Sequence, residues 1–240
     1  MNLFKNVHES WIPLLHSLAY KEPLVSFLTN LSTMSFQPDI SQIFRVFEMP
    51  VQDIKVVILG KEPYPMPRVA NGLAYAAQEG ANTPKVLLKI DEEMSSQGVN
   101  MLELGIEDFQ TLGHLEEQGV FLLNTALTVM TGNAGSHAKY WREFTETVVS
   151  FISSENPCVW MLWGSDPLSY NIKISNSLLV KEYDRETIEE IPIDSQLNYV
   201  IPGSHPAASF FEDKEGDFSN DGFYITNKIL KKKSLTQIIW

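Results

Sequence analysis

The sequence is poor in cysteine and has no long apolar run, and both features narrow the classes of protein it can encode. Among its 240 residues Cys158 is the one cysteine, so no disulfide can form within the chain. No stretch approaches the ~20 apolar residues that cross a bilayer. The opening MNLFKNVHES lacks the apolar core of a signal peptide. We therefore expect an intracellular protein, cytoplasmic or nuclear, with no membrane contact and with Cys158 as a buried thiol.

Metal-binding motifs and excess positive charge are also missing. There is no CxxC or HExxH pattern and the five histidines are scattered, so we expect no metal site. The 30 acidic residues outnumber the 18 basic ones and give a net charge of −12. Proteins that hold DNA through its phosphates usually carry a basic face. The acidity therefore argues against tight nonspecific binding to DNA.

What the sequence does contain is an alternation of buried strands and amphipathic helices. Continuous apolar runs bounded by turn residues are typical of parallel strands covered on both faces. Four such runs are VVILG (56–60), GVFLLNTALTV (119–129), CVWMLWG (158–164) and LNYVIPGSHP (197–206). Helical spacing of apolar residues predicts helices over 83–98, over 140–154, from Gly222 onward and, as two or three short ones, in 1–50.

This alternation predicts the fold class. We expect a three-layer α/β/α sandwich around a mainly parallel four-stranded sheet, as a single domain over 1–240. In the helix over 83–98 we expect Thr83 as the N-cap, Pro84 as the first helical residue and Gly98 just past the end.

An acidic insertion is expected over 181–196. Its part 181–194, KEYDRETIEEIPID, has six acidic and two basic residues. A solvated insertion or hairpin is one reading, and a surface that binds a protein partner is the other.

Unusual residues follow each of the four predicted strands. They are KEPYP (61–65), Asn124, Gly164–Ser165 and SHPAAS (204–209). Ligand sites of open α/β sheets form outside the carboxyl ends of the strands, so these loops are expected to share one site. The lone acid Glu62, held among prolines, is expected to face a ligand.

These loops carry the motifs of a known family. GKEPYP is similar to G-Q-D-P-Y-H, NGLAY to H-G-L-C-F, and FLLNTALTV to L-L-L-N-x-x-L-T-V. AGSHAKYWREFT is similar to A-x-S-H…W-x-x-F-T, and LWGS is identical to the family's L-W-G-S. HPAAS occupies the place of the family's H-P-S-P-L. In this order, from about residue 50 to Trp240, the sequence resembles the uracil-DNA glycosylase family, of family 1 type. A poxvirus branch similarly has P-Y-P and H-P-A-A.

The resemblance implies an enzyme that flips uracil out of DNA and hydrolyses its N-glycosidic bond without a cofactor. It implies that Glu62 serves as the catalytic carboxylate and that His205 donates a hydrogen bond to uracil, worth ~3 kcal/mol in the transition state. Asn124 would read the base edge, Tyr75 would stack on the base, and Tyr64 would exclude the methyl group of thymine. Structural alternatives are a backbone-satisfied Asn124, a core aromatic at Tyr75 and an exposed loop histidine at His205.

Further roles follow from the same resemblance. Lys61 is a candidate for uracil binding, either through its charge beside Glu62 or by pointing outward to phosphate. His137 is read as structural support. The candidates for DNA contact are Pro63, Lys85, Ser165, Ser209 and Phe210, with Phe210 or Phe211 as the wedge that fills the vacated stack.

Departures from the family pattern keep a second hypothesis open. Glu62 replaces an aspartate, and misplacing a catalytic group by about one ångström can cost ~100-fold, so Glu62→Asp is expected to raise activity. Lys61, Pro65, Lys85 and Ala207 replace a Gln, a His and two Ser of the family. The alternative is therefore an inactive member that binds modified DNA or a protein partner. A glycosylase for another base is less favoured because Tyr64 and Asn124 suit uracil.

Overall fold

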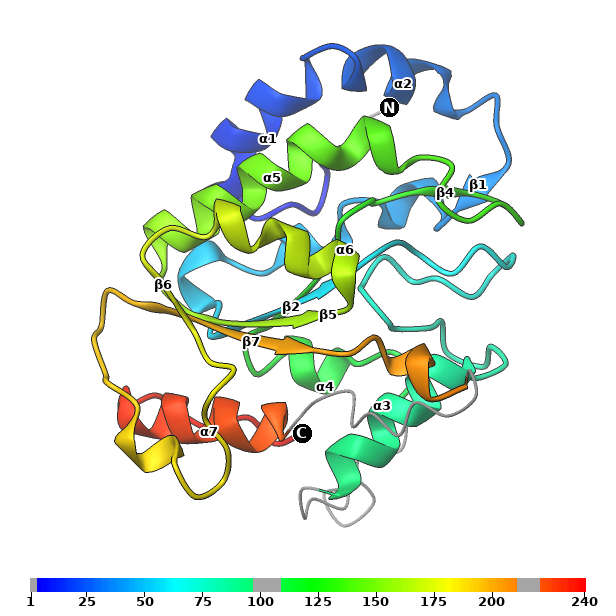
Figure 1. The fold of residues 1–240 in the computed structure, drawn as a ribbon. Coiled ribbons are helices and arrows are strands. Elements are labelled where there is room, and N and C mark those ends of the chain that lie inside the picture. The colour runs from blue at the N-terminus through cyan, green and yellow to red at the C-terminus, as the bar shows by residue number, and fades with distance from the viewer. Residues whose placement is uncertain (1–3, 97–108, 211–220) are drawn as a thin grey trace.

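The fold is built on a parallel sheet, seen edge-on in Figure 1. The computed structural model describes residues 4–96, 109–210 and 221–240. The sheet has five strands in the order β3-β2-β5-β7-β6, all parallel to their neighbours. The strands are β2 Val56–Gly60, β3 Val120–Asn124, β5 Val159–Trp163, β6 Ser177–Leu179 and β7 Asn198–Gly203.

The four predicted strands are confirmed, and the structure adds the short edge strand β6. Its three residues are exposed or half-buried, so they form no apolar run that the sequence pattern could have revealed. The predicted strand over 119–129 ends at Asn124. Val129–Met130 is a separate strand, β4, which pairs in antiparallel fashion with β1, Phe36–Gln37.

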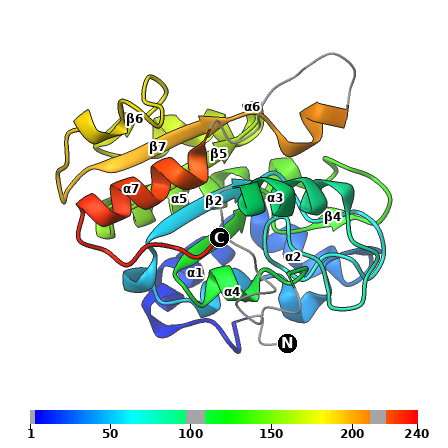
Figure 2. The same ribbon diagram turned by 90° about the horizontal axis from the view of Figure 1, so that it is seen from below.

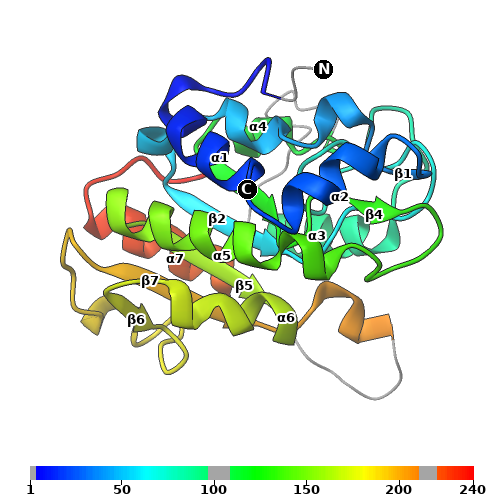
Figure 3. The ribbon, with the colours of Figure 1, turned by 90° about the horizontal axis from the view of Figure 1, so that it is seen from above.

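Helices cover both faces of the sheet, which confirms the three-layer class. One face carries α1 Ile12–Ala19, α2 Leu24–Leu31, α5 Ala138–Glu155 and α6 Ser165–Leu168 (Figures 1 and 3). The other carries α3 Lys85–Ser96, α4 Gly113–Glu116 and α7 Gly222–Lys232 (Figure 2). The short 3-10 helices are η1 Glu9–Trp11, η2 Ile40–Gln42, η3 Arg45–Glu48, η4 Val51–Asp53, η6 Ser169–Lys173, η7 Ile188–Glu190 and η8 Pro206–Phe210.

Helix α3 begins slightly later than its sequence suggests. Its first residue is Lys85, and the N–H of Leu88 donates to the carbonyl of Pro84 at 3.1 Å. Pro84 therefore occupies the capping position that was expected for Thr83. The expected stop at Gly98 lies outside the described residues.

The core is one contiguous apolar cluster that reaches from the first helices to the carboxyl end of the chain. The indole rings of Trp11, Trp141, Trp160 and Trp240 are all buried in it. Cys158 is buried as well, and burial raises the pKa of its thiol. Within the described ranges, no helix is long and apolar enough to cross a membrane.

The acidic segment 181–196 packs against α7 and does not project freely into solvent. Ile188 and Ile191 are buried in the core. Glu189 pairs with Lys228 at 2.9 Å and with Lys232 at 3.5 Å, both from α7. The acids were correctly expected to be exposed, but the apolar residues between them anchor the segment.

Candidate active site

The carboxyl ends of the central strands bring the predicted loops to one edge of the sheet. In the register of β2 and β3, Gly60 lies directly beside Asn124, and in that of β5 and β7, Trp163 lies beside Gly203. The loops that carry Glu62 and His205 leave from these positions, at the right of the sheet in Figure 1. Parallel pairing thus places segments distant in sequence at one edge.

Gly60 allows the side chains at this edge to approach closely. A Cβ atom at Gly60 would lie 2.7 Å from Oδ1 of Asn124, 2.9 Å from Cβ of Ala74 and 3.4 Å from Cε2 of Tyr75. Contacts below 3.0 Å are not tolerated without movement, so any larger residue would push these groups apart. The missing side chain is what lets Asn124 and Tyr75 meet.

Asn124 presents a buried amide with no protein partner. The residue is 3% exposed, yet its side chain forms no hydrogen bond within the described part of the chain. No backbone group satisfies the Asn124 side chain among the described residues, so its donor and acceptor are available to a ligand.

Tyr75 is held in an unusual conformation beside Asn124. Its φ is 63°, in the left-handed region that non-glycine residues rarely adopt. Its ring centroid lies 5.3 Å from that of Trp163 and 6.3 Å from that of His205. The Tyr75 hydroxyl is buried without a hydrogen-bond partner among the described residues, and burial raises its pKa. Strain and an unpaired polar atom coincide here, as they do at functional sites.

Tyr64 is pinned against Tyr75 by its hydroxyl, which donates to the Tyr75 carbonyl at 2.8 Å. Burial raises the pKa of Tyr64, so the phenol stays protonated and keeps this bond. The ring is therefore fixed at both ends, by the backbone among prolines and by its hydroxyl. A fixed ring is suited to refusing an extra methyl group on a bound base.

The contacts of His205 determine which of its nitrogens carries the proton. The N–H of Ala207 donates to Nδ1 of His205 at 3.1 Å, so Nδ1 accepts and the neutral ring carries its proton on Nε2. Burial, and then the positive charge of Lys61, lower the pKa of His205. The half-buried His205 is thus a neutral Nε2–H donor at neutral pH, not an exposed loop histidine.

Glu62 is engaged by a loop that the sequence did not connect with it. Both of its carboxylate oxygens accept from the N–H of Gly135, at 2.9 Å for Oε1 and 2.7 Å for Oε2. No contact recorded among the described residues joins this carboxylate to Asn124, Tyr75 or His205. Tyr75 thus lies near both Asn124 and His205, whereas the carboxylate of Glu62 is bonded to the 131–137 loop.

The proposed DNA contacts are less completely placed. Lys61, Lys85 and Ser165 are exposed, and Pro63 is buried. Helix η8, which contains Ser209 and Phe210, contacts α3. The side chains of those two residues, and the whole of Phe211, lie outside what the structure describes.

Two polar residues at this edge escaped the sequence reasoning. The hydroxyl of Thr125 lies 2.7 Å from the Lys61 carbonyl and 3.0 Å from Oδ2 of Asp166. Both follow strand ends, Thr125 directly after Asn124 and Asp166 shortly after β5. Position after a strand was thus a usable indication for both, although neither matches a quoted motif.

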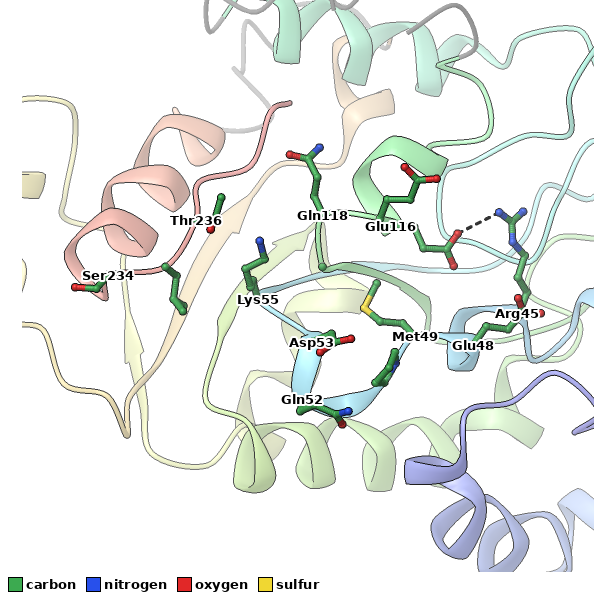
Figure 4. Close-up of a pocket in the computed structure, with 14 residues that line it drawn as sticks. Arg45, Glu48, Met49, Gln52, Asp53, Lys55, Glu116, Gln118, Ser234 and Thr236 are labelled. Carbon is green, nitrogen blue, oxygen red and sulfur yellow. Dashed lines mark hydrogen bonds and ion pairs between the residues drawn. The ribbon is translucent and has the colours of Figure 1, made fainter.

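A cleft lies elsewhere, at the amino ends of β2 and β3 (Figure 4). It measures about 770 Å³ and its lining includes Arg45, Lys55, Glu116 and Gln118. None of the predicted site residues lines it, and we give more weight to the chemistry of the carboxyl edge than to this volume. In the described ranges, no group of three or more His, Cys, Asp or Glu residues is arranged to hold a metal ion.

Comparison with known proteins gives consistent similarities over nearly the whole chain. The uracil-DNA glycosylase of Flavobacterium johnsoniae is 33% identical, with 98% of both chains covered. That of Azobacteroides pseudotrichonymphae is 34% identical, covering 92% of this chain and 91% of its own. The crystal structure of mimivirus uracil-DNA glycosylase matches with a TM-score of 0.76 at 21% identity, covering 100% of this chain and 89% of the other. No protein-family model matches the chain.

Proposed function

The chain belongs to the uracil-DNA glycosylase family, and on that premise we propose that it releases uracil from DNA by hydrolysing the N-glycosidic bond. One observation carries this proposal above the others, the unpartnered amide of Asn124 against Tyr75. An amide can match both a carbonyl and an N–H on the edge of a pyrimidine. The substrate would thereby supply the hydrogen bonds that the described protein groups do not give this amide.

The base is held by the aromatic cluster in this mechanism. A uracil flipped out of the stack lies against the Tyr75 ring while Asn124 bonds to its edge. Tyr64, fixed by its bond to the Tyr75 carbonyl, occupies the space that a thymine methyl would need. Selection of uracil over thymine thus follows from the rigidity of Tyr64.

The bond between C1′ and N1 then breaks, and the base leaves as an anion. The Nε2–H of His205 donates to the uracil oxygen on which negative charge builds. Glu62 stabilises the positive sugar and orients a water that attacks C1′, and the proton released from that water goes to solvent by way of the carboxylate. No step needs a cofactor.

The sequence supports finer proposals. GKEPYP and HPAA support a family 1 type with poxvirus-like loops, and we propose residues 1–240 as one functional unit. The DNA surface comprises Lys61, Pro63, Lys85, Ser165, Ser209 and Phe210. A buried, unpaired Cys158 suits a reducing cytoplasm or nucleus. The acidic segment 181–196 is proposed as a surface for a protein partner: Glu189 is paired with α7, while Glu182, Glu186 and Glu190 are exposed.

A uracil-release assay tests the proposal. Native protein is incubated with a single-stranded oligonucleotide containing one uracil, at low ionic strength, and free uracil is measured. A thymine oligonucleotide should yield no free base, and His205→Ala should slow release about 100- to 1,000-fold, the usual effect of losing one such donor. A folded protein that binds the uracil oligonucleotide without releasing base, at any concentration, would instead support the inactive alternative.

A further inference from the structure

The bond between Glu62 and Gly135 gives the loop between β4 and α5 a defined role, on the premise of the proposed function. We propose that the N–H of Gly135 is a positioning group that fixes the Glu62 carboxylate, and that this site is built for glutamate. The N–H is shared between both carboxylate oxygens, at 2.9 and 2.7 Å. Both distances lie within the usual range of N–H···O hydrogen bonds.

The loop that presents Gly135 is tied down on several sides. Its Gly132 N–H donates to the Pro65 carbonyl at 2.9 Å, and the hydroxyl of Ser136 accepts from Met130 N–H at 2.8 Å. These bonds join the loop both to the segment that follows Glu62 and to β4. The position of the Gly135 amide is therefore determined by the fold and not by Glu62 itself.

The residue after the loop is anchored in the core. His137, the N-cap residue of α5, is buried and its Nδ1 lies 3.0 Å from the hydroxyl of Thr128. That hydroxyl also accepts from the indole N–H of Trp141 at 2.7 Å, so Thr128 joins His137 to the buried Trp141. His137 thus anchors the end of the loop that reaches Glu62. This contact is consistent with the structural role that the sequence suggested for His137.

Side-chain length decides the consequence. A glutamate reaches the Gly135 amide, whereas an aspartate, one methylene shorter on the same proline-bounded backbone, falls short of it. A carboxylate offers about four acceptor positions, and one N–H leaves the others able to hold a water. The longer acid is therefore secured rather than misplaced. This is the opposite of the sequence-based expectation that Glu62→Asp raises activity.

The first arm of the test measures the bond directly, without reference to activity. Amide hydrogen exchange is followed by NMR at Gly135 and Gly132 in the native protein, Glu62→Asp and Glu62→Ala. Exchange at Gly135 should quicken in both variants. Exchange at Gly132, whose partner is a backbone carbonyl, should not change. An unchanged rate at Gly135 in Glu62→Ala would overturn the inference.

The second arm measures kcat and KM for uracil release. Glu62→Asp should lower kcat by about 10- to 100-fold, in line with the effect of misplacing a catalytic group, and leave KM nearly unchanged. A kcat equal to or above that of the native protein would contradict the proposal. If native protein releases no uracil, the proposed function fails, and the exchange data alone decide whether Gly135 positions Glu62.

Matched glycine variants separate positioning from loop strain. Gly132 and Gly135 have φ values of 75° and 77°, and an added Cβ meets nothing within 4 Å at either, so alanine strains both equally. The two variants should melt at similar temperatures. Gly135→Ala keeps the N–H but strains the backbone that aims it at Glu62, so it should lower kcat about tenfold more than Gly132→Ala does. In the Glu62→Asp background, Gly135→Ala should change kcat by no more than about twofold, because the bond is already lost. Equal effects of both glycines on kcat, or full additivity, would refute the assignment.

Discussion

The two ends of the sheet differ in how their polar side chains are bonded. The amino end holds a cleft of about 770 Å³, and three of its polar side chains, Arg45, Glu116 and Gln118, bond to the protein. Arg45 bonds to Glu116 at 3.2 Å (Figure 4). Gln118 bonds to the carbonyls of His114 and Ile239. At the carboxyl end, the Tyr75 hydroxyl is buried without a partner among the described residues, and the Asn124 side chain makes no hydrogen bond to them.

Buried polar atoms without a described partner also occur at Asn171 and Thr226, so the carboxyl end is distinguished by having such a group, the Tyr75 hydroxyl, near the Asn124 amide. At the amino end, the ion pair between Arg45 and Glu116 joins η3 to α4. Polar groups without protein partners at the carboxyl end lower the stability of the fold. A ligand that bonds to them would recover that free energy. Paired substitutions at the two ends test the distinction.

The largest effect is expected from changing an amide to an acid at each end. Asn124→Asp keeps the shape but loses the donor and adds a negative charge where uracil binds, so kcat/KM should fall about 100- to 1,000-fold. Gln118→Glu removes the N–H groups that bond to His114 and Ile239 and should lower stability by about 1–3 kcal/mol. Its activity per folded molecule should be unchanged. Uracil release and thermal melting are measured for both variants. If Gln118→Glu loses as much activity as Asn124→Asp, the two ends of the sheet do not differ as proposed.

An intermediate effect is expected from adding one methyl group at each end. In Gly60→Ala the new atom would meet Oδ1 of Asn124 at 2.7 Å, and in Gly119→Ala it would meet the Asp53 carbonyl at 2.4 Å. Both crowded variants should lose about 1–3 kcal/mol of stability. Only Gly60→Ala should also lose activity per folded molecule, about 10- to 100-fold, because Asn124 moves. Normal specific activity in Gly60→Ala would show that the close approach of Asn124 to Gly60 is not needed for catalysis.

The smallest effect concerns charge near His205. Burial, and secondarily Lys61, lower its pKa, so the ring contributes stability above its ordinary pKa of about 6.5, and that stability is lost as pH falls through the lowered value. Lys61→Gln should raise the pKa of His205, although burial keeps it below the ordinary value. Lys55→Gln, at the amino end, should leave it unchanged. NMR titration of the imidazole checks both, and an identical pKa in all three proteins would show that Lys61 does not act on His205.

Several features were predictable because they rest on local pattern. The continuous apolar runs identified β2, β3, β5 and β7, and the positions after them pointed to Asn124 and His205. Strand β6 was not predictable, because three half-exposed residues leave no periodic trace. The packing role of 181–196 was also missed, since two isoleucines among many acids do not show which helix they contact.

The candidate site divides in the same way. Residue types at strand ends allowed Glu62 and Asn124 to be chosen in advance, whereas Tyr75 and the role of Tyr64 followed from the resemblance to the family. The tautomer of His205 was not accessible, because it depends on a backbone N–H two residues later that only a folded turn can aim. Which of the chosen side chains remain unpaired was equally hidden.

The sequence by itself determined the layered α/β class and the family, because apolar runs and motif order are properties of the chain alone. Tertiary structure decided where the carboxylate of Glu62 is held. Its partner, Gly135, lies far along the sequence in a loop tied to β4 and α5. Hydrogen bonds act over about 3 Å, and no linear pattern specifies which distant amide comes within that range.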